Sequence, residues 1–139
     1  MITKAIQIAI KAHANQHDKA GAPYILHLIR VMQKGKTDEE KICGILHDLV
    51  EDTNWSFQQL EKEGFSNEII EALKCVTKKE NENYENFINR ISKNKLATKV
   101  KLYDLEDNLD IKRLKNIDKK SLERINKYLH AFHRLKMLH

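Results

Sequence analysis

Apolar residues recur at intervals of three and four along most of the chain, a spacing that places them on one face of an α-helix. In the first such segment it puts His13 on the buried face, together with Ile2, Ile6, Ala9 and Ile10. Similar periodicity predicts further helices within residues 67–76, 84–91, 96–109 and 121–138. No segment alternates strictly between apolar and polar residues, as a half-buried β-strand would. The pattern therefore predicts an all-α fold of about seven or eight helices.

Two helix starts carry a further signature. Thr37 is followed three residues later by Glu40, and Ser56 by Gln59. In such a capping box the hydroxyl accepts from a free backbone N–H of the first turn, and the side chain at the third position reaches back. We therefore expect helices to begin directly after Thr37 and Ser56.

The composition fits one helix-rich domain. The 139 residues are 41% hydrophobic and 32% charged, with 4 Gly and 1 Pro. A chain of this length normally forms one domain. We expect a single globular domain over residues 1–139, with a C-terminal helix at 119–139 packing on it. Lysines interrupt the first apolar segment, so we expect neither a signal peptide nor a membrane span, and a cytoplasmic protein.

The two cysteines, Cys43 and Cys75, lie far apart in apolar helical patterns and form no CxxC spacing. In an intracellular protein such residues usually remain reduced core thiols. We expect neither a disulfide nor a zinc site at these positions.

The formal net charge of +5 would suit a polyanionic partner, either nucleic acid or a phosphorylated ligand. Many lysines, however, lie in mixed runs such as 61–63 and 78–80, which are typical of solvated helix faces. The clearest basic excess comes late, at Lys112, Arg113, Lys115, Lys119 and Lys120. No helix-turn-helix or interleaving of aromatic and basic residues is recognisable. We therefore do not expect a nucleic-acid partner.

Metal-binding chemistry is indicated by the run at residues 46–52, which holds His47, Asp48, Glu51 and Asp52 beside an apolar segment. On one helix His47 and Glu51 share a face, as do Asp48 and Asp52. Such a set of nitrogen and oxygen donors can form a divalent metal site. The competing interpretation is a frayed, acidic helix end on the surface.

Two other segments could complete a metal shell. The turn at 21–24 with its single proline delivers His27 early into a second helix. Asp104 lies inside an apolar helical stretch, four residues before Asn108, and a buried carboxylate is costly unless paired or metal-bound. Taken alone, His27 could equally be a core histidine with one satisfied nitrogen.

The last helix carries an apolar stripe with His130 and His133 three residues apart. These histidines could bind a second metal, but no carboxylate joins them. The stripe is more typical of a packing or dimer helix, so a homodimer is one expectation.

The chain resembles a known family, the HD-domain hydrolases, and within them the RelA/SpoT-type and small alarmone hydrolases that remove the 3′-pyrophosphate from (p)ppGpp. The resemblance rests on segments that follow one another in the family's order, at 13–16, 19–27, 46–53 and 100–108. They cover about four-fifths of the chain.

The resemblance implies a set of functional residues. His27, His47, Asp48 and Asp104 correspond to the ligands of one divalent ion, usually manganese, and two imidazoles with two carboxylates suit such an ion. Glu51 and Asp52 correspond to the acidic pair that orients and deprotonates the attacking water. The substrate-binding residues are Lys19, Asn108 and Tyr24, the last of which could instead have a packing role.

Three positions depart from the resembling enzymes. Asp18, Leu105 and Asp110 stand where those enzymes carry arginine. Each change removes positive charge near the expected nucleotide, and Lys112 or Arg113 could restore some of it. We expect weakened (p)ppGpp binding, and improved affinity in Asp18→Arg.

Three hypotheses about function follow. The preferred one is a metal-dependent phosphohydrolase, an enzyme that acts on (p)ppGpp or on a different phosphorylated nucleotide. The second is a nucleotide-binding sensor without turnover, which would have no need of Glu51 and Asp52. The third, a small nucleic-acid-binding protein, rests on charge alone.

Overall fold

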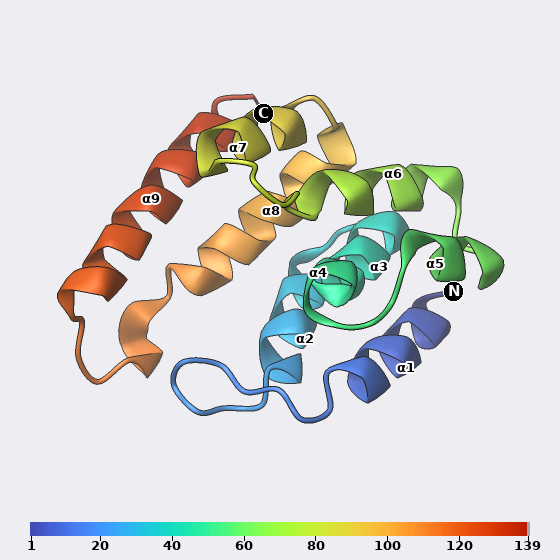
Figure 1. Cartoon of the computed structure of the whole chain (residues 1–139), viewed down its shortest axis with the longest axis horizontal. Coiled ribbons are helices and arrows are strands. Elements are labelled where there is room, and N and C mark those ends of the chain that lie inside the picture. The colour runs from blue at the N-terminus through green and yellow to red at the C-terminus, as the bar shows by residue number, and fades with distance from the viewer. Residues whose placement is uncertain (139) are drawn as a thin grey trace.

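The computed structural model describes residues 1–138, and its regular elements are helices (Figure 1). In chain order they are α1 (Ile2–Ala12), α2 (Ile25–Lys34), α3 (Asp38–Leu46), α4 (Leu49–Asp52), α5 (Phe57–Lys62), α6 (Asn67–Val76), α7 (Tyr84–Ser92), α8 (Lys95–Asn108), the 3-10 helix η1 (Ile111–Arg113) and α9 (Lys119–Lys136). Over residues 1–138 the only extended pairing is an isolated bridge between His17 and Pro23. The all-α expectation is confirmed, and α4 and α5 are short additions to the longer helices.

Helix starts follow the capping residues. The Ser56 hydroxyl accepts from the Gln59 N–H at 3.2 Å, and Gln59 Oε1 accepts from the Ser56 N–H at 2.8 Å, which completes the capping box. The Thr37 hydroxyl likewise accepts from the Glu40 N–H at 3.1 Å. The Glu40 carboxylate, however, accepts from the Lys36 N–H rather than from that of Thr37. Both predicted starts are confirmed, but the reciprocal bond forms only at Ser56.

The later helices lie where the periodicity placed them. The range 67–76 matches α6, and α7 and α8 differ from the expected bounds by one residue at the ends. The last helix ends at Lys136, two residues before the end of the expected range 121–138. His139, which the expected helix included, lies outside the described residues.

The core is centred on α3, whose residues from Ile42 to Leu46 are all buried. Gly44 allows α2 to lie directly against α3, because a Cβ at this position would stand 3.1 Å from the Met32 Cα. Close packing of α2, α3 and α8 gathers side chains from three distant parts of the sequence. His13, expected on the buried face of the first helix, is 1% exposed.

The chain bends between α3 and α4. The pattern at 46–52 predicted one helix end, but α3 ends at Leu46 and α4 begins at Leu49. Asp48 leaves helical geometry with φ −101° and ψ 2°. The Asp52 N–H still donates to the Asp48 carbonyl at 3.0 Å, so the four-residue spacing is kept. The expectation of one continuous helix is wrong, and the bend places His47 and Asp48 at a junction.

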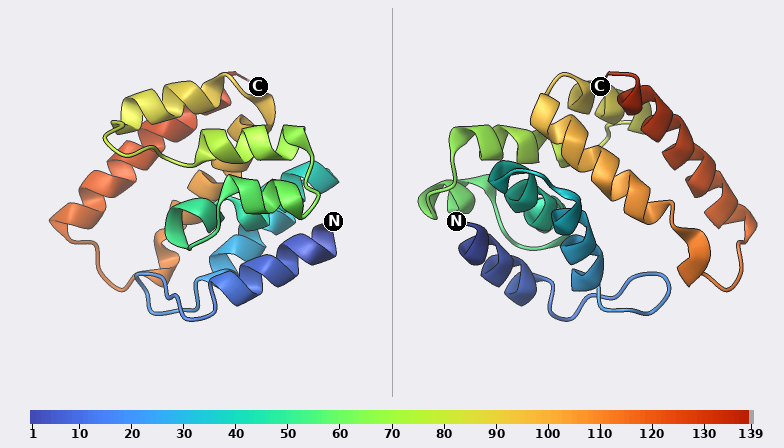
Figure 2. Two further views of the ribbon diagram at one scale, coloured as in Figure 1. Left: turned by 45° about the vertical axis from the view of Figure 1, so that its right-hand side comes forward. Right: turned by 180° about the vertical axis from the view of Figure 1, so that it is seen from behind.

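The last helix, α9, lies along α8 and also touches α7, as both views in Figure 2 show. Its Ala131 and Leu135 are buried, whereas Leu122 and Leu129 are 52% and 40% exposed. Contact between two copies through the exposed side stays a prediction. In residues 1–138, His133 joins no group of neighbouring metal-ligand side chains, nor does His130.

Two further expectations can be compared with the structure. Cys43 is buried, Cys75 is partly buried, and both are free thiols, as predicted. Among residues 1–138, no helix combines the length and the apolar character that a membrane span requires.

Candidate functional site

The structure brings the four predicted metal ligands together. They come from α2, from the α3–α4 junction and from α8, which lie in the middle of the ribbon (Figure 1). Asp104 Oδ1 lies 3.0 Å from His27 Nε2 and 3.2 Å from His47 Nε2. Asp48 Oδ2 lies 3.1 Å from the same His47 nitrogen. The four side chains thus form a single cluster, called the metal cluster below.

These distances fit a divalent ion. Ligand atoms about 2.1 Å from an octahedral ion lie about 3 Å from one another. One ligand atom each from His27, His47 and Asp48 lies within 4.8 Å of the others. Two imidazoles and two carboxylates without a thiolate suit a transition-metal ion of intermediate hardness. The residues present therefore fit the ion that the resemblance implies.

Both imidazoles are oriented by a partner on their other nitrogen. His47 Nδ1 lies 2.7 Å from the Gly44 carbonyl, which can only accept, so this nitrogen carries a proton. His27 Nδ1 lies 2.6 Å from Asp107 Oδ2. Such partners fix the tautomer and the ring orientation of a metal-binding histidine. Each histidine is thereby made to present Nε2 to the cluster.

The charges of the cluster are strongly coupled. Burial favours the neutral imidazole of His47, but the carboxylates of Asp48 and Asp104 outweigh it and raise the pKa well above the ordinary value. Burial also disfavours an ionised Asp104, yet Lys101 and His47 hold its pKa well below the usual range. The carboxylates are therefore ionised and stabilised by cationic neighbours. A divalent cation would take the place of the imidazolium protons.

Asp107 is an important part of the site that the sequence analysis missed. Besides facing His27, its carboxylate accepts two hydrogen bonds from the Arg30 guanidinium, at 2.7 Å and 3.1 Å, in a bidentate contact. Burial alone would raise the pKa of Asp107, but the hydrogen bonds with His27 and Arg30 outweigh it and hold this pKa well below the usual range. Arg30 follows His27 by three residues on α2, and Asp107 follows Asp104 by three on α8, so each pair shares a helix face. That spacing could have revealed both residues.

Lys101 and Asn108 flank Asp104 on α8. The Lys101 ammonium donates to Asp104 Oδ2 at 2.9 Å, and the Asn108 amide donates to Oδ1 at 3.1 Å. Asn108, expected to contact a nucleotide, therefore also supports a cluster carboxylate. Lys101, which the sequence analysis did not single out, supplies a buried positive charge.

The acidic pair Glu51 and Asp52 lies beside Asp48. One carboxylate oxygen of each of these three residues lies within 4.8 Å of the others. Burial, with the charges of Asp48 and Glu51, raises the pKa of Asp52 to about 6. Glu51 Oε1 accepts from the Lys78 N–H at 2.9 Å. Asp52 is thus suited to accept a proton near neutral pH.

A pocket of about 330 Å³ adjoins the cluster; it is called the nucleotide pocket below, after the ligand that the resemblance implies. All three expected substrate residues, Lys19, Tyr24 and Asn108, line it. The lining comes from the 17–24 loop, from the end of α8 and the segment after it, and from α9. Its residues are His17, Asp18, Lys19, Ala20, Tyr24, Asn108, Asp110, Arg113, Leu114, Arg124 and Tyr128. The Tyr24 hydroxyl donates to Asp48 Oδ2, so this side chain joins pocket and cluster. Arg124 and Tyr128 on α9 were not predicted, because their distance from the motifs hides them.

Known proteins resemble the chain, although no protein-family model matches it. It is 41% identical over 81 residues to a guanosine-3′,5′-bis(diphosphate) 3′-pyrophosphohydrolase from Borreliella burgdorferi. The aligned residues are 55% of this chain and 12% of that protein. It is 31% identical over 120 residues to a protein of the same name from Aquifex aeolicus. That alignment covers 78% of this chain and 17% of the Aquifex protein. The chain therefore spans less than a fifth of these relatives.

A solved structure has the same fold. It belongs to a metazoan ortholog of SpoT, described as hydrolysing ppGpp, and aligns with a TM-score of 0.79 at 22% identity over 96% of this chain and 84% of that one. In sequence and in fold, the chain resembles the RelA/SpoT-type HD domains. The family resemblance seen in the sequence is confirmed.

The structure shows what the side chains do at the three positions where the resemblance implied arginine. Asp18 Oδ1 accepts from the N–H groups of Ala20 and Ala22, both at 2.9 Å, and so shapes the loop that carries Lys19. Leu105 is fully buried in the core. Asp110 lies 3.8 Å from Arg113. Arg113, Arg124 and Lys19 give the pocket three permanent cations against two carboxylates, so it keeps a positive excess.

Proposed function

We propose that this HD domain hydrolyses the 3′-pyrophosphate of (p)ppGpp with one divalent ion, in the first instance Mn²⁺. The observation that carries the proposal is the convergence of His27, His47, Asp48 and Asp104 next to a cation-lined pocket. The two curated relatives described above are named for this reaction.

Substrate binding would use the nucleotide pocket. Lys19, Arg113 and Arg124 offer charged donors to phosphate oxygens, and an arginine can hold two oxygens at once. The rings of Tyr24 and Tyr128 offer flat apolar faces to a purine. The Asn108 amide has a second proton free of Asp104 for the nucleotide. The pocket would thus place a 3′-phosphate beside the cluster.

The hydrolytic step needs a base near the attacking water. The water oxygen bonds to the phosphorus attached to the 3′-oxygen, the bond between that phosphorus and the 3′-oxygen breaks, and pyrophosphate is released. Asp52 would take a proton from the water, and Glu51 would orient it. The departing 3′-oxygen must gain a proton, which the protonated Asp52 can return. A divalent ion held by the cluster would polarise the phosphate and lower the pKa of a bound water.

A turnover assay tests the proposal. Purified protein is incubated with ppGpp and Mn²⁺, with and without a chelator, beside a panel of GTP, GDP and ATP. We expect GDP and pyrophosphate in equal amounts from ppGpp, and none with the chelator. Binding of ppGpp without turnover in any divalent metal would show a sensor instead. Turnover of another nucleotide alone would show that the substrate is different.

We also propose that residues 1–139 form one catalytic unit that works in the cytoplasm. Its nucleotide pocket combines the loop after α1 with α9, so segments far apart in the sequence contribute to it. A cell-fractionation experiment with the native protein, with turnover measured in each fraction, tests this location. Activity confined to the membrane fraction would contradict it.

A further inference from the structure

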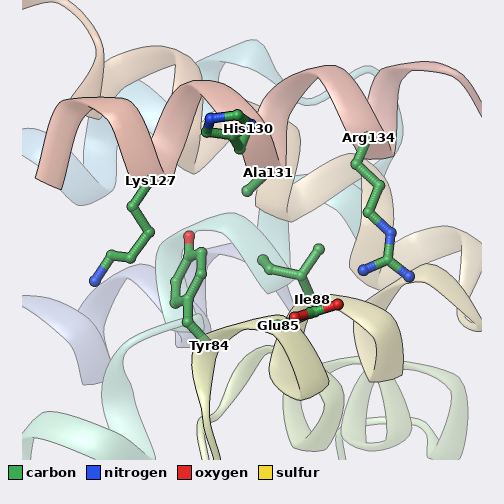
Figure 3. Close-up of a pocket in the computed structure, with 7 residues that line it drawn as sticks. All are labelled: Tyr84, Glu85, Ile88, Lys127, His130, Ala131 and Arg134. Carbon is green, nitrogen blue, oxygen red and sulfur yellow. The ribbon is translucent and has the colours of Figure 1, made fainter. Parts of the chain in front are cut away.

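A second cavity lies between α7 and α9, away from the metal cluster. It measures about 550 Å³, which is larger than the nucleotide pocket and within the usual range for small-molecule sites. Figure 3 shows Tyr84 and Lys127 at one end, Arg134 at the other, and Ile88 with Ala131 between them. The proposed hydrolysis uses none of these residues.

We propose that this cavity binds a small aromatic anion of mononucleotide size, as a site separate from the nucleotide pocket. The inference goes beyond the proposed hydrolysis and does not depend on it. It rests on the shape of the cavity, on its apolar floor and on the cations at its edges.

The floor and one wall suit a flat ring. Ile88 and Ala131 are 2% and 5% exposed, so they form a firm apolar base. The Tyr84 ring stands beside them in Figure 3. A planar base placed against these groups would bury apolar surface and stack on an aromatic face.

The polar edges suit an anion. Lys127, His130 and Arg134 project from one side of α9, and Glu85 on α7 is the single carboxylate in the lining. The Lys127 ammonium lies 4.6 Å from the Tyr84 ring centroid, so a cation–π contact holds it at the mouth. Arg134 is likewise placed, because it donates to Asn89 Oδ1 at 2.7 Å. Two cations are therefore positioned at the two ends of the cavity.

Lys127 lies near several other cations. After burial, the groups that most lower the pKa of Lys127 are Lys101, Arg124 and Lys78, all of them cations. A bound phosphate would relieve this repulsion and form charge-assisted hydrogen bonds. The cavity chemistry thus favours a phosphorylated ring over a neutral one.

The cavity also adjoins the nucleotide pocket. The rings of Tyr84 and Tyr128 lie 6.4 Å apart, centroid to centroid, and Tyr128 lines the nucleotide pocket. One aromatic pair therefore separates the two spaces. Occupancy of the cavity would press on Tyr84 and, through it, on Tyr128, which lines the nucleotide pocket.

Methyl groups distinguish the two sites in a titration followed by NMR. Ile88 and Ala131 report on the cavity, whereas Ala20 and Leu114 report on the nucleotide pocket. The probes are GMP, AMP, guanosine and inorganic phosphate, added to the full chain. We expect GMP or AMP to shift the Ile88 and Ala131 signals saturably, and guanosine to bind at least about tenfold more weakly.

Variants test the role of charge. Lys127→Gln should weaken the cavity-specific binding about tenfold, whereas Lys136→Gln, on the same helix but outside the lining, should leave it unchanged. The inference is overturned if millimolar GMP and AMP leave the Ile88 and Ala131 methyls unmoved, or if guanosine binds as tightly as GMP. Shifts confined to Ala20 and Leu114 would assign all binding to the nucleotide pocket. Because GMP carries no 3′-pyrophosphate, a failed hydrolysis assay leaves this result unaffected.

Discussion

The metal cluster and the nucleotide pocket lie side by side but are built differently. His27, His47 and Asp104 are at most 5% exposed and are held by hydrogen bonds on nearly every polar atom. In the pocket, by contrast, the cationic side chain of Arg113 is 34% exposed, donates to the Asp107 carbonyl at 3.3 Å and lies 3.6 Å from the Asp107 carboxylate. A preorganised centre suits chemistry, and an adaptable rim suits recognition. The comparison therefore predicts that rates depend on the first region and substrate affinity on the second.

The largest effect is expected from the acid beside the cluster. Asp52→Asn should lower kcat by about 10²- to 10⁴-fold while metal content stays unchanged, because the amide cannot accept a proton. In the wild type, kcat should rise as the pH increases through about 6, as Asp52 ionises. The variant should lose this rise. Glu51→Gln should also lower kcat, though less, because Glu51 is partly engaged by Lys78. Turnover and elemental analysis check both, and near-normal kcat in Asp52→Asn would contradict the assignment.

A second test concerns the support behind His27. Asp107→Asn should weaken metal binding about 10- to 100-fold. An amide is uncharged and has one acceptor oxygen, so it cannot hold both His27 and Arg30 as the carboxylate does. The matched control is Glu106→Gln, its neighbour on α8, which contacts only Lys34 at 3.7 Å on the surface.

Calorimetric titration with Mn²⁺ measures both affinities, and circular dichroism confirms that each variant is folded. Equal affinities for the two variants would show that Asp107 is a packing residue only.

The pocket side of the comparison is tested on α9. Arg124→Gln should raise KM for ppGpp about tenfold and leave kcat and metal content close to wild type, because a charge-assisted contact to phosphate is lost. Lys120→Gln, one turn earlier and outside the pocket lining, is the control. A fall in kcat with unchanged KM would place Arg124 in the chemical step and break the proposed division.

The smallest effect is expected at Asp18, where the structure reverses the expectation from sequence. Asp18→Arg should raise KM a few-fold rather than improve affinity, because the loop loses its two backbone N–H contacts. Asp18→Asn keeps an acceptor oxygen and should behave almost like wild type. Saturation curves for the two variants decide, and tighter binding by Asp18→Arg would restore the simple charge argument.

The same contrast explains how much could be read from the sequence. The cluster residues occur in short local patterns, such as the adjacent pair His47 and Asp48, so spacing and chemistry were enough to select them. The all-α fold followed equally well from apolar periodicity, since helix formation and burial have the same local period.

Residues brought in by tertiary packing could not be found in this way. Arg124 and Tyr128 enter the pocket only because α9 folds back along α8. The bend at His47 and Asp48 was also missed, because helical spacing on both sides hides a two-residue interruption. Asp107 is an intermediate case, since its spacing from Asp104 was visible but its partners His27 and Arg30 lie on another helix.

The central claim is that His27, His47, Asp48 and Asp104 hold one divalent ion. The most direct measurement is the metal content of wild-type and Asp48→Ala protein after loading with Mn²⁺ and gel filtration. We predict about one ion per wild-type chain and almost none in Asp48→Ala, with the helical circular dichroism spectrum retained in both. Equal metal content in the two proteins would contradict the proposed cluster.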